Sequence, residues 1–285
     1  MGSSIFYKVL LPPFFMKVVI FNDTQNFNGS LNFINNRFKK DEKRFWNYKK
    51  YIPFLMKKIK SIDNLNKEDF QLIKTYFYEG RYNSRLLNSH QWHCNQKIAD
   101  LNRMIKKEQF LLNFISQEKL SQKCRRKVNV HVNQNKKAFE EKKQEYFSYI
   151  AKQKRNFEGQ KELFEKLKNN SLIDLKSTPL KQKEGEIYQK GVDVLMAIDL
   201  VNLAHTPSAY DVAIILSGDT DLIEAVKLIE TLGKTAIIFS YHAPGNPKRS
   251  NISDLMTVGK FINLKDFTDE EIFEMSDLRE DGGEN

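Results

Sequence analysis

The sequence predicts an α/β fold in which helices flank a parallel sheet. The first observation is a strand–helix–strand succession, in which a helix over 219–232 joins strands over 210–217 and 235–240. This order, with short connections, implies parallel strands in one sheet. The second is a β-branched run over 17–21, which fits another buried strand. The third is a middle segment, 84–170, that contains one glycine and no proline and therefore favours long helices.

The first third of the chain supplies the first strand and the helices that follow it. Local patterns predict, in order, a strand over 17–21, helices over 30–38 and 44–60, and a strand over 70–78. Pro53 is expected to kink or split the second helix. Polar side chains follow the first strand at once, in Asn22-Asp23-Thr24-Gln25-Asn26.

Two apolar stripes at helical spacing mark the middle segment. One consists of Ile98, Leu101, Ile105, Leu112 and Ile115, and the other of Phe139, Tyr146, Ile150, Phe157 and Phe164. Two long helices packed as a hairpin account for both stripes. The alternating stretch over 128–132 is a possible interruption of these helices.

The last third of the chain returns to alternating helices and strands. The prediction is a helix over 192–203, the strand–helix–strand unit over 210–240, a helix over 251–259, a short strand over 261–264 and an acidic tail. Gly233 occupies the position expected just after a helix end.

Composition limits the class of protein. The chain has 285 residues, a net charge of +10 and two cysteines. Two cysteines can build neither a disulfide framework nor a four-cysteine zinc site, and we expect a cytoplasmic location. No apolar run is long enough for a membrane-spanning helix, so we expect no membrane partner. The basic excess favours a polyanion such as nucleic acid.

Carboxylates follow the predicted strands. Asp23 ends the first strand, and Asp219 and Asp221 follow the strand over 210–217 within Ser217-Gly218-Asp219-Thr220-Asp221. Asp193 opens a helix that can reach the same edge of the sheet. Clustered carboxylates repel unless a cation is present, and Mg²⁺ or Mn²⁺ is the usual cation for oxygen ligands. The competing interpretation is that these aspartates only cap the helices that follow them.

Three motifs resemble one known family. They are Val18-Val19-Ile20-Phe21-Asn22-Asp23 with Asn26, then Lys190-Gly191-Val192-Asp193, then Tyr210-Asp211 with the Ser-Gly-Asp-Thr-Asp motif. In order and context they resemble the NYN domain, a PIN-like group that includes the LabA-like proteins. The resemblance covers about 16–84 and 143–264. Thr24 stands where members usually carry glycine, and Asn22 where an apolar residue is common.

The resemblance implies a Rossmann-like, PIN-like sandwich and a metal-dependent endoribonuclease. Asp23, Asp193, Asp219 and Asp221 fall on the acidic positions of the family. A water activated by Mg²⁺ or Mn²⁺ on Asp23, Asp193 and Asp219 would attack an RNA phosphate, and Asp221 would bind a second ion or orient water. Asn26, Lys190 and Ser217 are candidate substrate-binding residues; Lys190 either touches a phosphate or only begins a helix.

The basic segment over about 85–139 has no counterpart in that family and looks like an insertion. Between Lys97 and Lys190 there are 23 Lys and Arg residues against 12 Asp and Glu. The densest group is Lys123, Arg125, Arg126 and Lys127. These side chains either contact RNA phosphates or form a solvated helix face.

Other candidate ligands carry less weight. Tyr76, Phe77, Tyr78 and Tyr82 have the chemistry to stack on bases, but strand aromatics more often belong to a core. The spacing of His90, His93, Cys94, Cys124 and His131 matches no closed zinc site, and we expect none there.

The sequence therefore predicts three parts. Residues 1–15 are an N-terminal extension, 16–264 form a nuclease domain interrupted by a basic helical insertion at about 85–142, and 265–285 are an acidic tail. We expect a metal-dependent endoribonuclease with an RNA partner. The alternative is a non-catalytic RNA-binding or regulatory module of the same fold, whose insertion serves homodimerisation or partner docking.

Overall fold

A computed structural model describes residues 15–279, except 63–64, 67, 120 and 244–251. Residues 1–14 of the expected extension over 1–15 lie outside the described residues, and Phe15 is the first residue of a strand. Contacts divide the chain into two compact units. The first contains residues 1–79, 167–177 and 191–285, and the second contains 80–166 and 178–190.

The first unit is built on a six-stranded sheet with the order β4-β3-β1-β7-β8-β9. Its strands are β1 (Phe15–Asp23), β3 (Asp69–Arg81), β4 (Ile173–Pro179), β7 (Val212–Leu216), β8 (Thr235–Ser240) and β9 (Lys260–Asn263). The pairings of β3, β1, β7, β8 and β9 along this order are all parallel. The structure confirms the predicted α/β fold with a parallel sheet, and β1 and β7 lie next to each other at its centre.

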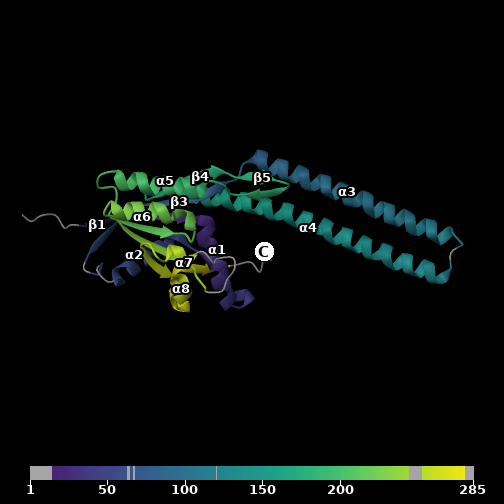
Figure 1. Ribbon diagram of the computed structural model, residues 1–285, viewed down its shortest axis with the longest axis horizontal. Helices are drawn as coiled ribbons and strands as arrows, with labels where there is room; N and C mark the ends of the chain where they lie inside the picture. Colours follow the sequence, from purple (N-terminus) through teal and green to yellow (C-terminus); the bar gives the residue numbers. More distant parts are fainter. Residues whose placement is uncertain (1–14, 63–64, 67, 120, 244–251, 280–285) are drawn as a thin grey trace, which may run out of the picture. The chain divides into compact units, whose positions relative to one another are not determined.

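Helices cover both faces of the sheet (Figure 1). On one face, Phe21 and Ile215 pack with Met196 of α5 (Val192–His205) and Ile229 of α6 (Ile223–Thr231). On the other face, Phe239 contacts Phe267, which in turn contacts a ring of α2 (Tyr48–Lys58). α1 (Thr24–Ile34) and α8 (Asp269–Met275) are two further helices of the first unit. Fully buried central strands explain why β7 and β8 appear in the sequence as continuous apolar runs.

Several boundaries differ from the predicted ones. The first helix begins at Thr24, directly after β1, because Asp23 caps it. The predicted helix over 44–60 contains a short strand, β2 (Arg44–Trp46), followed by α2, which continues through Pro53. The helix predicted over 219–232 begins as a 3₁₀ turn, η4 (Thr220–Leu222), before α6. Gly233 has a φ of +78°, the left-handed conformation expected just past a helix end.

The described part of the acidic segment is folded. After the 3₁₀ turn η6 (Leu264–Asp266), α8 begins at a Thr268–Glu271 capping box. β10 (Ser276–Leu278) then pairs antiparallel with β2. Glu271 and Asp277 each form an ion pair with a lysine of α2, Lys58 and Lys50, at 2.5 Å. The acidic charge of this segment therefore faces basic residues of the first unit.

The second unit contains the predicted helical hairpin. Its helices are α3 (Ser84–Gln117) and α4 (Gln122–Lys168), which lie side by side (Figure 1). A small antiparallel pair, β5 (Lys181–Lys183) and β6 (Glu186–Tyr188), belongs to the same unit. α4 runs without a break through 128–132, so the alternating pattern there does not interrupt the hairpin; α3 ends at Gln117 and α4 begins at Gln122 instead.

Four smaller elements belong to the described part of the first unit. η1 (Asn35–Arg37), η2 (Lys40–Glu42) and η3 (Ile59–Ser61) are single 3₁₀ turns, and α7 (Ile252–Leu255) is one helical turn. Within the described ranges, every helix is too short or too polar to cross a membrane.

Candidate metal centre

Asp23 occupies the carboxyl end of the central strand β1. Its Oδ1 accepts a hydrogen bond from the backbone N–H of Asn26 at 3.1 Å, which caps α1. Its Oδ2 accepts one from Ser217 Oγ at 3.3 Å. The residue is 4% exposed. The capping interpretation is thus correct for Asp23, and the same carboxylate also reaches the neighbouring strand.

The loop after β7 is held by a chain of hydrogen bonds. Ser217 Oγ accepts from the backbone N–H of Asp219 at 3.1 Å, and Asp219 Oδ1 accepts from that of Asp221 at 3.0 Å. Asn26 Oδ1 accepts from the N–H of Gly218 at 3.0 Å and so ties α1 to this loop. Asp219 also caps its helical turn, as the competing interpretation requires, but only its Oδ1 is engaged in that cap.

Asp193 approaches from the start of α5. Gly191, with a φ of +79°, precedes this helix in the left-handed conformation that a side chain would disfavour. The chain turns there and places Asp193 in the first helical turn. One carboxylate oxygen each of Asp193, Asp219 and Asp221 lie within 4.8 Å of one another. The structure therefore brings together three of the four aspartates, and Ser217 links the fourth, Asp23, to the same loop.

The electrostatics of this cluster are unfavourable without a cation. Burial raises the pKa of Asp23 to about 6, and the charges of Asp219 and Asp193 raise it as well. Burial also raises the pKa of Asp219, with the charges of Asp221 and Asp193 adding to it. No ion pair to any of these four carboxylates occurs among the residues that the structure describes.

The donor set fits a hard divalent cation. Carboxylate oxygens suit Mg²⁺ and Mn²⁺, which keep part of their coordination for water and phosphate oxygens. No other cluster of three such ligands exists in the described part of the chain. His90 and Cys94 of α3 contact each other and the backbone instead: His90 Nδ1 lies 2.8 Å from the carbonyl of Gly185, and Cys94 Sγ lies 3.6 Å from His90 Nε2.

Ser240 is a polar residue at this edge that sequence reasoning missed. The register pairs Asn22 with Leu216, and Ile215 with Ile238. Asp23, Ser217 and Ser240 therefore follow their strands in one row of side chains on the α5 face. Ser240 is 1% exposed, and its hydroxyl has no hydrogen-bond partner in the described structure. The signal was a polar residue closing an apolar strand, the same signal that singled out Asp23 and Ser217.

The other predicted residues have varied surroundings. Asn26 and Ser217 hold the acidic loop through the bonds above, and their contact with substrate stays a prediction. Lys190 belongs to the second unit, where its carbonyl accepts from Thr178 Oγ1 at 3.1 Å. Phe77 and Tyr78 are buried core residues, and Tyr76 packs against the same core. Tyr82 belongs to the second unit, where its hydroxyl lies 2.7 Å from Gln153 Oε1.

Together, the parallel sheet and its acidic carboxyl edge define a PIN-like α/β fold of the nuclease type. The chain belongs to the NYN domain family, whose model matches residues 113–257. The match contains Asp193, Asp219 and Asp221, whereas Asp23 lies before it. Comparison with curated proteins and with solved structures finds no match.

Proposed function

We propose that this chain is a metal-dependent endoribonuclease. The observation that carries the proposal is the group of three carboxylates within 4.8 Å that lacks a cationic partner among the described residues. Family membership supports it, because NYN domains have a nuclease-type fold. A cytoplasmic location is part of the proposal, and the free state of Cys94 and Cys124 agrees with it.

Each residue of the site has a proposed task. Asp193, Asp219 and Asp221 hold Mg²⁺ or Mn²⁺, with Asp23 beside them. A divalent ion in such a site supplies an activated water and neutralises charge on the phosphate and the leaving oxygen. Ser217 donates to the Asp23 carboxylate and accepts from the backbone N–H of Asp219, so it orients the first carboxylate and holds the main chain that carries the second. Asn26 fixes the loop that carries Asp219.

The test is incubation of the purified protein with a labelled RNA pool in Mn²⁺, Mg²⁺ or EDTA. We expect internal cleavage with either metal and none in EDTA. Products shortened one nucleotide at a time would contradict endonucleolytic cleavage. A DNA pool of the same sequences shows whether the protein distinguishes ribose from deoxyribose.

The alternative function is a non-catalytic RNA-binding or regulatory module of the same fold. It predicts RNA binding without cleavage in every metal condition. Retention of all four aspartates argues against it, since a binding module needs no cluster of mutually repelling carboxylates.

A further inference from the structure

The free end of the hairpin has a surface that the acidic site does not use. We define the hairpin end as residues 103–130, the last turns of α3 and the first turns of α4. Asn135 Nδ2 donates to Glu108 Oε1 at 3.0 Å, and Lys143 Nζ to Asn102 Oδ1 at 3.4 Å. These bonds join antiparallel helices and set their register, which places Phe114 level with the turn of α4 that contains Val130.

The hairpin end carries positive charge without compensation. It holds eight Lys and Arg residues against two Asp and Glu. Over the described residues, neither the lysines at 106, 107, 123 and 127 nor Arg126 form an ion pair. Further along α4, Lys137, Lys142 and Lys143 each pair with a glutamate one helical turn away, whereas Lys152, Lys154 and Arg155 form no ion pair over the described residues. In the described part of the hairpin end only Arg103 pairs, with Asp100, so unpaired cations are concentrated there.

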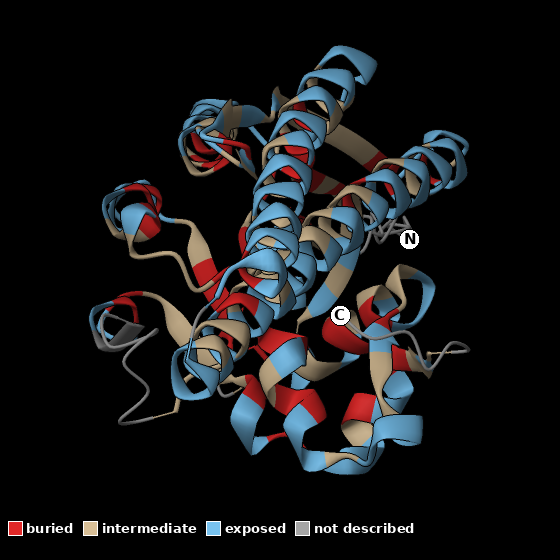
Figure 2. Ribbon diagram, turned by 90° about the vertical axis from the view of Figure 1, so that its right-hand side faces the viewer, coloured by how far each residue is buried: buried red, intermediate tan, exposed pale blue. Residues whose placement is uncertain are grey.

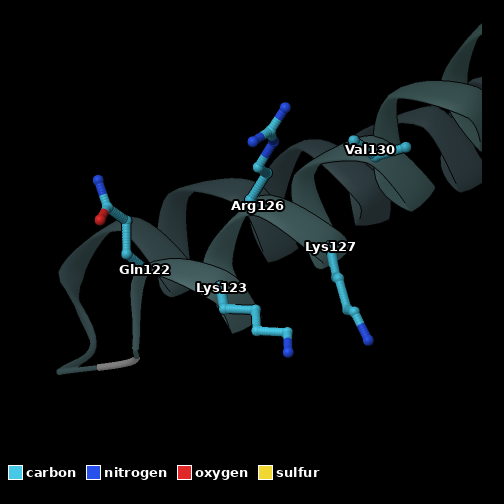
Figure 3. A pocket seen from close by; sticks show the side chains of 5 residues that line it. All are labelled: Gln122, Lys123, Arg126, Lys127 and Val130. Carbon is cyan, nitrogen blue, oxygen red and sulfur yellow. The ribbon is translucent and has the colours of Figure 1, made fainter.

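These cations surround a groove of about 680 Å³ at the start of α4. Gln122, Lys123, Arg126, Lys127 and Val130 line it (Figure 3). Lys123 and Lys127 extend to one side of the helix and Arg126 to the other. Arg125 differs from them, because its Nη2 donates to the carbonyl of Glu118 at 2.9 Å and supports the turn between the helices.

Aromatic side chains are exposed beside this charge. Phe110 is 73% exposed and Phe114 is 50% exposed, one turn apart on α3. The outer faces of both helices are exposed along their length (Figure 2). Leaving two phenyl rings in water is unfavourable, and such rings mark interaction sites more often than other surface.

We propose that the hairpin end binds single-stranded RNA, with its cations on the phosphates and Phe110 and Phe114 stacked on bases. Alternation of unpaired cations and exposed aromatic rings is the pattern that holds single strands, whose bases are free to stack. A second copy of the chain is disfavoured, because it would bring another eight cations against the first eight. The choice of RNA among polyanions rests on the proposed function.

Binding is measured on the full chain in EDTA, with fluorescein-labelled single-stranded RNA and a matched RNA duplex at three salt concentrations. EDTA removes the divalent ions that cleavage requires, so the measurement reports binding alone. Failure of the binding proposal can therefore be distinguished from failure of the proposed nuclease function. For the triple variant Lys123→Gln/Arg126→Gln/Lys127→Gln we expect weaker binding and a salt slope shallower by about 2, since each phosphate contact contributes about 0.7. The control is Lys137→Gln/Lys142→Gln/Lys154→Gln, which removes the same charge elsewhere on α4.

Phe110→Ala/Phe114→Ala tests the stacking. We expect single-strand affinity to fall about 5- to 100-fold for each stacked base, with the salt slope and the duplex affinity unchanged. Phe147→Ala, on a 46% exposed ring further along α4, is the matched control. Circular dichroism verifies that each variant remains helical.

Four results would overturn the proposal. One is equal binding by the triple variant and its control, and another is equal binding by the phenylalanine variant and Phe147→Ala. The third is a wild-type dimer in sedimentation that Phe110→Ala/Phe114→Ala dissociates, which would assign the rings to self-association. Binding of the wild type to anionic vesicles, but not to RNA, would assign the surface to lipid headgroups.

Discussion

Asp219→Asn is expected to reduce metal-dependent RNA cleavage by about 10³-fold or more while leaving the fold intact. Asp219 belongs to the group of three carboxylates and interacts with Asp23, Asp193 and Asp221. Metal-ion catalysis supplies several kcal/mol of transition-state stabilisation, and each 1.36 kcal/mol is tenfold in rate. An asparagine Oδ1 still accepts the N–H bond that Asp219 receives from Asp221, so the helical turn η4 keeps its cap.

The matched control is Glu224→Gln, which removes one negative charge from α6 nearby in sequence but outside the cluster. It should retain wild-type cleavage. Cleavage rates are compared in Mn²⁺ and Mg²⁺, and thermal unfolding in EDTA verifies folding. If a folded Asp219→Asn protein cleaves RNA at the wild-type rate, the acidic loop takes no part in the reaction.

The centre of the fold was predictable because its signals are local. β7 is an apolar run buried throughout, and β1 and β8 are buried from Val18 and Ala236 onward, so burial and sequence pattern coincide there. The site was predictable for a related reason. Parallel strands bring their carboxyl ends to one edge, so Asp23 and Ser217, distant in sequence, become hydrogen-bond partners.

The edges of the fold depend on distant partners and escaped prediction. Arg44–Trp46 forms a strand because Ser276–Leu278 pairs with it, more than 200 residues away. The acidic charges near the C-terminus predicted an acidic tail and no partner for it, whereas Glu271 and Asp277 pair with lysines of α2. Neither partner is visible from local composition.

Capping and metal binding cannot be separated by sequence spacing, and the structure shows why. Asp23 and Asp219 each cap a helical turn with one oxygen. Each aspartate also has a second role: Asp23 Oδ2 accepts from Ser217, and Asp219 contributes one carboxylate oxygen to the three-carboxylate group. A cap fixes a carboxylate in place and can thereby prepare it for a cation.

Asp23→Asn is expected to make the metal-free protein more stable at pH 7. Burial and the charges of Asp219 and Asp193 raise the pKa of Asp23 from 3.8 to about 6. A raised pKa means that the protonated carboxyl stabilises the fold. This contribution is complete below about pH 3.8 and is lost as the pH rises through about 6. The difference of about two pK units corresponds to about 3 kcal/mol of unfolding free energy.

Asparagine keeps the cap on α1, because its Oδ1 accepts the N–H of Asn26 as the carboxylate does, and it carries no charge to desolvate. In EDTA, wild type should therefore lose up to about 3 kcal/mol between pH 4 and pH 7 that Asp23→Asn does not lose. Mn²⁺ should restore the stability of the wild type at pH 7 and stabilise the variant less. A ligand that binds only the folded state stabilises it more when it binds more tightly. Denaturant unfolding at both pH values, with and without Mn²⁺, measures each difference. The contradicting result is that Asp23→Asn is the less stable protein at pH 7 in EDTA. The hydrogen bonds of the carboxylate to Asn26 and Ser217 would then stabilise the fold by more than its buried charge destabilises it. Repulsion within the acidic cluster would in that case not be what recruits a cation.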